Sequence, residues 1–462
     1  MTNKSVLGID LGTSAVKLLQ RFSDGTIRKE KERYEEISPK GWWEAILRAM
    51  TRMELASVEA IGLSSQVGTY IVDGEKVISW NQPIGQEELE ELKRTYTQDE
   101  FMEEISMPHP NIISYPLPRL QYRKKMYPNF QKVVQPKDFI CEKLTGMCVT
   151  DPYSWRGLAN LDTKTYSKKF LKDIGVEEEM LPPIIDYTEK AGQVLQDAVP
   201  GSDLREGTAV YVGLNDYYAS LLAMGVWNTG DMFDITGTSE HLGIIEAAVD
   251  EDTQMVSGPY LQHHVHYGVT GSSGVSLDFG LQFSETGEVD MEEALSHKPP
   301  IFLPYLNGER APIWDGAARG NLFGIQAGCS KKDIMYAVLE GVSFSLYHIY
   351  EELGKPEATS LCSAGGASRN RALGQLKAEL FGIPVKILKE HDTSALGTCM
   401  VAELGMKKYS SVQEAMETCV TVEETFYPTG AYRETLMQRF ALYKELYPAL
   451  KENMKRLGGM KS

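Results

Sequence analysis

The sequence predicts an α/β protein made of two related halves. Strand-like apolar runs alternate with amphipathic helical segments along most of the chain. The tripeptide Gly-Thr-Ser occurs at 12–14 and again at 237–239, each time after a strand that ends near a polar residue. A chain of 462 residues is long for a single hydrophobic core. We therefore expect two domains, 1–226 and 227–462, that face each other across a central cleft.

Composition excludes several classes of partner. The formal net charge of -17 argues against nucleic acid and anionic membranes, because both require a basic surface. No apolar run is long enough to span a bilayer, and the first residues carry no signal-peptide core. The 6 cysteines are scattered without metal-type spacing, so reduced thiols and a cytoplasmic location are expected. ATP is compatible with this charge, since a nucleotide site needs only a local cradle.

The first hairpin is a candidate phosphate site. Residues 6–11 and 15–19 form two strand-like runs, joined by a tight turn of small residues. Gly12 lets the backbone bend, and with Thr13 and Ser14 it offers N–H and hydroxyl groups to an anion. The alternative is an ordinary hairpin whose turn happens to be Gly-Thr-Ser.

Two charged residues flank this turn. Asp10 can hold Mg²⁺ directly or through water, because Mg²⁺ prefers carboxylates, phosphates and water. Lys17 adds a movable positive charge.

The next elements are a charged strand at 27–34, a helix at 41–53 and a buried strand at 58–63 that leads to Gln66. Strand, hairpin, helix, strand is the order found in the ribonuclease-H-like fold of actin-type phosphotransferases. This order resembles that fold, and the expected fold class is two ribonuclease-H-like (actin-like ATPase) domains.

Residues 80–146 contribute mainly surface helices. The acidic helix at 86–93 and the basic residues from Arg119 to Lys125 are predicted to present solvated faces. Residues 107–118 contain four prolines (108, 110, 116, 118) and are predicted to form a loop. A helix carrying Cys141 then ends near Gly146.

Asp216 lies between a predicted strand, 208–213, and a helix, 217–224. Open α/β folds place ligands at such strand ends. The alternative is that Asp216 or Asn215 only caps the helix.

The second half repeats the hairpin, with strands at 232–236 and 241–245 around Gly237, Thr238 and Ser239. Two such turns can hold one polyphosphate from opposite sides. A glycine- and serine-rich turn, 268–274, precedes a helix from Val275, and Gly274 ends this turn.

The remaining segments complete the second half. An ordered loop is predicted at 302–315, a strand at 319–325, and a long amphipathic helix at 333–353. Further elements are a strand at 359–363 and helices at 372–382 and 394–404. Gly365 and Gly366 lie between strand and helix, where they let a base or phosphate approach the backbone. Neither a P-loop nor a Gly-x-Gly-x-x-Gly motif occurs, so any ATP would bind through the two hairpin turns and Gly365-Gly366.

This set of motifs resembles the FGGY carbohydrate kinase family over nearly the whole chain. The matching segments, in family order, are 8–14, 62–66, 213–216, 237–239, 302–315 with 320–340, and 365–370. The resemblance implies an ATP-dependent sugar kinase with Mg²⁺ as its metal. Its acceptor would be a small ketose or polyol, and a xylulose-like sugar is the first expectation. The chain could also form a homodimer.

The resemblance also implies roles for individual residues. Asp216 would be the catalytic base and Asp10 the metal ligand. The nucleotide and its phosphates would contact Gly12, Thr13, Ser14, Lys17, Gly237, Thr238, Gly274, Gly365, Gly366, Ala367 and Asn370. The acceptor would contact Gln66, Trp80, Asn81, Asp216 and Tyr217.

Departures from the family pattern fall in the sugar pocket. Xylulokinases show Gln-Met-His and glycerol kinases Gln-Arg-Glu where this chain has Gln66-Val67-Gly68. The usual Asp-x-Arg after Trp80-Asn81 is replaced by Gln82-Pro83-Ile84, and the residue after Asp216 is Tyr217. The alternatives are a catalytically silent polyol- and nucleotide-binding sensor, or an actin-like filament or chaperone ATPase.

Overall fold

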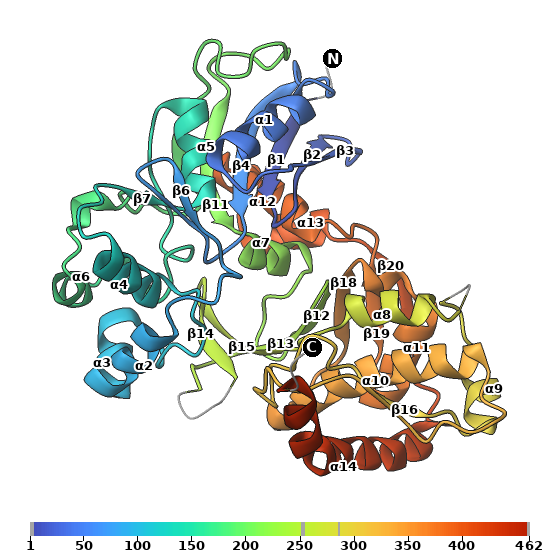
Figure 1. Ribbon diagram of the computed structural model, residues 1–462. Coiled ribbons are helices and arrows are strands. Elements are labelled where there is room, and N and C mark those ends of the chain that lie inside the picture. Colours follow the sequence, from blue (N-terminus) through green and yellow to red (C-terminus); the bar gives the residue numbers. More distant parts are fainter. Residues whose placement is uncertain (1–3, 251–254, 285–286, 460–462) are drawn as a thin grey trace. The chain divides into compact units, whose positions relative to one another are not determined.

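The computed structural model describes residues 4–250, 255–284 and 287–459. They form two compact units, each a mixed α/β assembly around its own sheet (Figure 1). Unit 1 comprises Met1–Gly225, Gly258–Gln262 and Asp392–Val420. Unit 2 comprises Val226–Ser257, His263–His391 and Thr421–Ser462. The predicted α/β class with two sheet-based domains is confirmed.

The units are not continuous in sequence. The first break, after Gly225, lies one residue before the predicted division at 226/227. The predicted second domain, 227–462, differs from unit 2 because Asp392–Val420 returns to unit 1. This return follows from the packing of one helix, α12 (Thr393–Gly405), on the sheet of unit 1.

Unit 1 is built on a six-stranded sheet of order β10-β11-β4-β1-β2-β3. Its strands are β1 (Ser5–Leu11), β2 (Ala15–Phe22), β3 (Ile27–Arg33), β4 (Val58–Ser65), β10 (Lys190–Gln193) and β11 (Ala209–Asn215). β1 runs parallel to β4, and β4 parallel to β11, so their carboxyl ends meet at one edge. β1 and β2 form the predicted hairpin, in which Asp10 pairs with Lys17.

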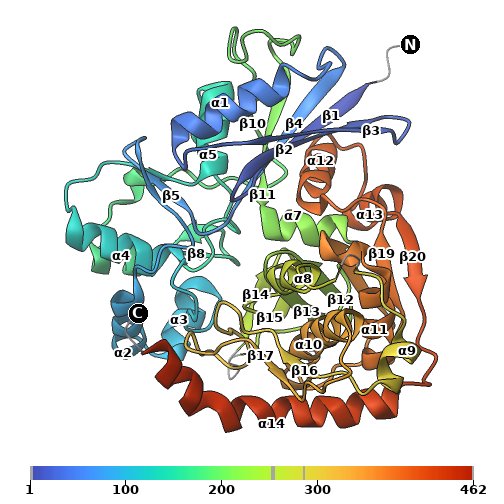
Figure 2. The same ribbon diagram turned by 45° about the vertical axis from the view of Figure 1, so that its right-hand side comes forward.

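Helices cover both faces of this sheet (Figure 2). Leu7 and Ile9 point toward the apolar face of α1 (Pro39–Met50) and α5 (Pro136–Thr145). Gly8 points the other way, and a Cβ there would lie 2.4 Å from the carbonyl of Ala395 on α12. Helix α7 (Asp216–Ala223) packs closely against α12 on that side.

Smaller elements complete unit 1. They are β5 (Tyr70–Val72), β6 (Lys76–Ile78), β7 (Val133–Val134), β8 (Ala159–Asn160), β9 (Thr165–Tyr166), α2 (Gln86–Thr95), α3 (Gln98–Ile105), α4 (Pro116–Met126), α6 (Lys168–Ile174), α13 (Val412–Cys419) and the 3₁₀ helix η1 (Glu178–Met180).

Two predictions in this region are wrong. The loop predicted for 107–118 ends early, because α4 begins at Pro116, and proline is tolerated in the first turn of a helix. Arg119 and Arg123 were expected on a solvated face but are 0% and 6% exposed. The Arg119 guanidinium is buried because it donates to the backbone carbonyls of Ile113, Trp80 and Gln82. The Arg123 guanidinium stacks on the Tyr127 ring at 3.8 Å.

Unit 2 has a seven-stranded sheet of order β14-β15-β13-β12-β18-β19-β20. Its strands are β12 (Met232–Thr236), β13 (Glu240–Glu246), β14 (Val256–Tyr260), β15 (His263–Val269), β18 (Leu361–Gly365), β19 (Val385–Leu388) and β20 (Val422–Phe426). β12 and β13 form the second hairpin, and β12 runs parallel to β18.

The helices of unit 2 share one hydrophobic core with its sheet. They are α8 (Gly274–Leu281), α9 (Met291–Ser296), α10 (Lys331–Glu352), α11 (Arg371–Phe381), α14 (Arg433–Gly458) and the 3₁₀ helix η2 (Ala367–Arg369), with a separate β16 (Ile301–Leu303) and β17 (Asn321–Phe323) pair. Over the described parts of the chain, no helix combines the length and the hydrophobicity that crossing a bilayer would require.

Candidate active site

Asp10 stands at the end of β1 and is held from two sides. Ser64 Oγ, at the end of β4, donates to Asp10 Oδ1 at 2.9 Å. Ser394 Oγ, in the first turn of α12, donates to Oδ2 at 2.5 Å. The side chain is 2% exposed, so its orientation is fixed. A carboxylate has about four acceptor positions, so two hydroxyl donors leave room for a cation or its water shell.

Lys17 lies beside this carboxylate on β2. Its ammonium forms an ion pair with Asp392 Oδ1 at 3.1 Å. Burial alone would lower the pKa of Lys17, but Asp10 and Asp392 outweigh it and raise the pKa. Lys17 is therefore charged but partly neutralised by Asp392, not the movable charge that the sequence suggested.

Asp216 is the first residue of α7, directly after β11. The capping role falls to Asn215, whose side chain accepts from the Tyr218 N–H at 2.9 Å, so the Asp216 carboxylate is not needed as the cap. One oxygen of Asp216 accepts from the Tyr217 N–H at 2.8 Å.

The acidity of Asp216 is strongly altered. Burial, followed by the charge of Asp10, raises its pKa to about 7, although the Tyr217 and Val67 N–H groups and Lys17 oppose the shift. A carboxyl group with this pKa can take up a proton near neutral pH, which a general base must do. Asp10, Lys17 and Asp216 thus form one electrostatic cluster at the carboxyl edge of the sheet of unit 1.

The predicted acceptor residues lie in the same unit. Gln66 follows β4 and is 3% exposed, and its side-chain carbonyl oxygen has no hydrogen-bond partner among the described residues. Trp80 Nε1 donates to Thr13 Oγ1 at 3.1 Å, which joins the Trp80 loop to the first Gly-Thr-Ser turn. Tyr217 is buried, whereas Asn81 is exposed. Thr13 and Ser14 are exposed and Gly12 is partly so, as a phosphate-binding turn requires.

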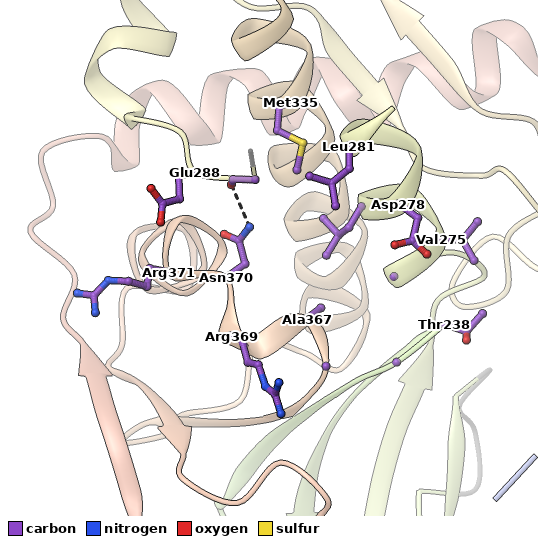
Figure 3. A pocket seen from close by; sticks show the side chains of 15 residues that line it. Thr238, Val275, Asp278, Leu281, Glu288, Met335, Ala367, Arg369, Asn370 and Arg371 are labelled. Carbon is purple, nitrogen blue, oxygen red and sulfur yellow. Dashed lines mark hydrogen bonds between the residues drawn. The ribbon is translucent and has the colours of Figure 1, made fainter. Parts of the chain in front are cut away.

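Unit 2 contains a cavity of about 630 Å³ (Figure 3). Six predicted residues line it: Gly237, Thr238, Gly274, Gly366, Ala367 and Asn370. Its size and its mixture of apolar walls and few polar groups are typical of a cofactor-sized ligand site.

Hydrogen bonds fix the shape of this cavity. The N–H groups of Ser273 and Gly274, where α8 begins, donate to the carbonyls of Thr238 and Gly237 at 3.0 and 2.9 Å. Asn370 Nδ2 donates to the carbonyl of Gly287 at 3.0 Å, the bond drawn in Figure 3. The second Gly-Thr-Ser turn and α8 therefore form one rigid wall.

The two adjacent glycines differ in role. Gly365 does not line the cavity; its φ is +104°, and a Cβ there would lie 2.0 Å from the carbonyl of Thr236. It serves the close pairing of β18 with β12. Gly366 does line the cavity, and a Cβ there would meet nothing within 4 Å.

Sequence reasoning missed several lining residues. They are Val275, Leu277, Asp278, Leu281, Gly287, Glu288, Met335, Arg369 and Arg371. Figure 3 shows Leu281 and Met335 close together on one side, with Asn370, Arg371 and Glu288 on another. Arg369 and Arg371 flank Asn370, so their neighbourhood in sequence could have predicted them. Met335 reaches the cavity from α10, which is distant in sequence from the other lining residues, so nothing near it in the sequence indicates this position. Ser64 and Ser394 were missed for the same reason.

Two family models together match most of the chain. The N-terminal domain of the FGGY family of carbohydrate kinases matches residues 5–223, and its C-terminal domain matches 233–406. A xylulose kinase of Bacillus subtilis (strain 168) is 26% identical over 97% of this chain and 98% of its own length.

Solved structures share the fold. A ligand-bound xylulose kinase from Lactobacillus acidophilus has a TM-score of 0.84 at 22% identity, covering 98% of this chain and 100% of that one. A gluconate kinase from Lactobacillus acidophilus has a TM-score of 0.83 at 22% identity, covering 97% and 98%.

The fold is the two-domain, actin-like ATPase fold that solved sugar kinases share. The chain belongs to the FGGY family of carbohydrate kinases. It is therefore an ATP-dependent phosphotransferase whose acceptor is a small-molecule sugar.

Proposed function

We propose that this kinase transfers the γ-phosphoryl group of ATP to a hydroxyl of a small ketose or polyol, with Asp216 as general base. The observation that carries the proposal is the Asp216 carboxyl, held at the start of α7 with a pKa raised to about 7 by burial and by Asp10. A base with this pKa changes protonation state easily at neutral pH, where a kinase operates. The similarity to xylulose kinases supports a ketopentose as the first acceptor to try.

The attack can be written around Asp216. The acceptor hydroxyl loses its proton to the carboxylate as its oxygen bonds to the γ-phosphorus. The bond from that phosphorus to the β,γ-bridging oxygen breaks, and ADP leaves. Positioning and electrostatics supply most of the catalysis in such transfers.

Asp10 is the proposed Mg²⁺ ligand. Its donor set fits a hard cation, since a buried carboxylate is oriented by Ser64 and Ser394 and keeps further acceptor positions. Bound Mg²⁺ would neutralise phosphate charge. Thr13, Ser14 and Thr238 would donate to phosphate oxygens, with Lys17 adding a partly compensated positive charge.

The cavity of unit 2 is the proposed nucleotide site. Leu281, Met335 and Ala367 offer an apolar surface for a purine, and Asn370 and Arg369 offer donors at its edge. Gly366 leaves the backbone open to the ligand. We further propose a cytoplasmic location, which the free state of Cys141, Cys148, Cys329, Cys362, Cys399 and Cys419 supports.

A coupled assay of ADP release tests the proposal. ATP and Mg²⁺ are supplied with ketopentoses, ketohexoses, tetritols, glycerol and sugar acids in turn. We expect ADP release that depends on the acceptor and exceeds the ATPase rate without acceptor by at least about tenfold. ATP hydrolysis independent of every acceptor, or ATP and polyol binding without ADP release, would contradict the proposed reaction.

A further inference from the structure

Glu309 is a buried carboxylate of unit 2 that does not line the proposed nucleotide cavity. It lies in the loop between β16 and β17 and is 4% exposed. Its Oε1 accepts from the backbone N–H groups of Gly271 and Arg310, the latter at 2.8 Å. Its Oε2 accepts from Ser345 Oγ, on α10, at 3.1 Å. One side chain therefore ties its own loop to α10 and to the residues that precede α8.

The contact with Gly271 is part of a close fit between the Glu309 loop and the glycine turn, residues 270–274. The Asn307 N–H donates to Ser272 Oγ at 3.2 Å. A Cβ on Gly271 would lie 2.4 Å from the carbonyl of Gly308, so the two backbones touch at this point. Glycine is required there because any side chain would push the loop and its carboxylate away from the turn.

The glycine turn in turn holds the second Gly-Thr-Ser turn. The N–H groups of Ser273 and Gly274 donate to the carbonyls of Thr238 and Gly237 at 3.0 and 2.9 Å. Thr238 lines the cavity and is a proposed donor to phosphate (Figure 3). Glu309 is therefore connected to Thr238 through one short turn of backbone.

A carboxylate suits this position because three donors converge on it. Burial raises the pKa of Glu309 to about 7, and the N–H groups of Arg310 and Gly271 and the Ser345 hydroxyl oppose the rise. Hydrogen bonds to an ionised acceptor are about twice as strong as those between neutral groups. Loss of the carboxylate would leave the Gly271 N–H without its acceptor, so the turn would be free to change its conformation.

We propose that Glu309 is a positioning residue for phosphate binding, which fixes the glycine turn and, through it, the orientation of Thr238 toward the phosphates of ATP. The inference rests on the proposed function, because it takes Thr238 to contact phosphate. Glu309 itself touches no substrate. Met335 and Asn370, proposed to contact the adenosine part, lie on other segments of the chain. The effect of Glu309 is therefore confined to ligands that carry phosphate.

Binding of ATP with Mg²⁺ and of adenosine to the full-length protein, measured by calorimetry at pH 8, tests this inference. Glu309 is largely ionised at that pH. We expect Glu309→Ala to weaken ATP binding at least about tenfold and adenosine binding less than about threefold. Glu309→Gln keeps the shape and one acceptor oxygen, so its loss of ATP affinity should be smaller. If Glu309→Ala does not fold, Glu309→Gln decides, with an expected loss of at least about threefold.

Two further variants separate the possible outcomes. Thr238→Val removes the proposed phosphate contact itself and should cause the same selective loss of ATP binding. Glu340→Gln is the matched control, because Glu340 is another glutamate of unit 2, 0% exposed, and it pairs with Arg439 at 2.7 Å. It should lower the melting temperature without changing the ratio of ATP affinity to adenosine affinity.

Unchanged ATP affinity in the Glu309 variants, with Thr238→Val impaired, would overturn the inference and leave the proposed function intact. An equal loss of ATP and adenosine affinity in the Glu309 variants would also overturn it, because the defect would then be a general one. Unchanged ATP affinity in Thr238→Val would overturn the inference together with the proposed phosphate role of the second turn.

Discussion

Asp216 illustrates how local burial produces reactivity. The residue combines two features, a place at the end of a parallel strand and a neighbouring carboxylate, Asp10. Like charges at close range raise a carboxyl pKa, as burial does, and Lys17 moderates the effect. The same cluster would hold phosphate and metal, so proton transfer and charge neutralisation are arranged at one sheet edge.

The pH dependence of activity follows from this shift. The base works only when ionised, and its pKa lies near 7 rather than near the ordinary 3.8. We expect log kcat/KM for the acceptor to rise with pH below about 7 and to level off above it. Initial rates from pH 5 to 9, with ATP saturating, measure this directly. A profile that is flat from pH 5 upward would show that Asp216 has an ordinary pKa.

Gly366 and Gly274 allow a matched pair of substitutions at the proposed nucleotide cavity. A side chain at Gly366 meets nothing within 4 Å, so Gly366→Val should fold normally but fill space that the ligand needs. We expect KM for ATP to rise at least about tenfold with little change in melting temperature.

Gly274→Ala should behave differently, because its Cβ would lie 2.5 Å from the carbonyl of Gly237. This variant should lose both stability and ATP affinity, since the second turn must shift. An unchanged KM for ATP in Gly366→Val would mean that the nucleotide binds elsewhere.

Residues in glycine-rich turns are the ones whose neighbourhood a sequence indicates best. Six of the residues predicted for the nucleotide line one cavity of unit 2, because turns that follow parallel strands lie at the same edge of an open α/β sheet, and their contact with a nucleotide stays a prediction. The prediction for Arg119 was wrong, because a run of basic residues is usually exposed to solvent. Only the fold shows that three backbone carbonyls surround the Arg119 guanidinium. The pairing of Lys17 with Asp392 joins residues far apart in sequence and has no local signal.

Among the secondary structure elements, a buried ion cluster joins β12, β13 and α11. Lys377 Nζ contacts Asp234 Oδ2 at 2.6 Å and Glu240 Oε1 at 2.5 Å, and Lys377 is 1% exposed. Glu240 also accepts from Ser273 Oγ at 2.9 Å, at the start of α8. The cluster thus links the second Gly-Thr-Ser turn to two helices that line the proposed nucleotide cavity.

Lys377→Met should therefore destabilise unit 2 and weaken nucleotide binding together. Loss of the lysine leaves two carboxylates buried and unpaired, which typically costs about 3–5 kcal/mol. Because burial and Asp234 raise the pKa of Glu240 to about 8, the loss should be largest at high pH, where Glu240 is ionised and has lost its cation. Denaturant unfolding at pH 6 and pH 9 checks this. Equal stability of variant and parent at pH 9 would contradict it.

For helix α12, the sequence predicts the helix itself but not the residues against which it packs. Its existence was predicted from residues 394–404, and in the structure Gly397 permits a close approach. The approach is to α7, where a Cβ on Gly397 would lie 1.8 Å from the carbonyl of Ala219. The helical pattern is local, but its partner is set by backbone contacts with Gly8 and Gly62, which lie more than 300 residues earlier. The sequence pattern therefore predicted the helix, but it did not predict that the helix belongs to unit 1.

For the whole molecule, the discontinuity of unit 1 has a direct consequence. A fragment of residues 1–225 lacks α12 and exposes the sheet face that Gly8 and Gly62 form. We expect this fragment to aggregate, whereas 1–225 joined to 392–420 by a flexible linker should melt cooperatively. Thermal unfolding followed by circular dichroism compares the two. A cooperative transition for 1–225 alone would show that α12 is dispensable.

For the whole molecule we propose that the two units have different roles. Unit 1 supplies the general base and the metal ligand, and unit 2 supplies the nucleotide cavity. The most direct test of this proposal is the turnover of Asp216→Asn with nucleotide binding measured on the same protein. We expect turnover to fall at least about a thousandfold, while the affinity for ATP, followed by calorimetry, stays within about threefold. Turnover within tenfold of the parent would contradict the assignment of Asp216 as the base.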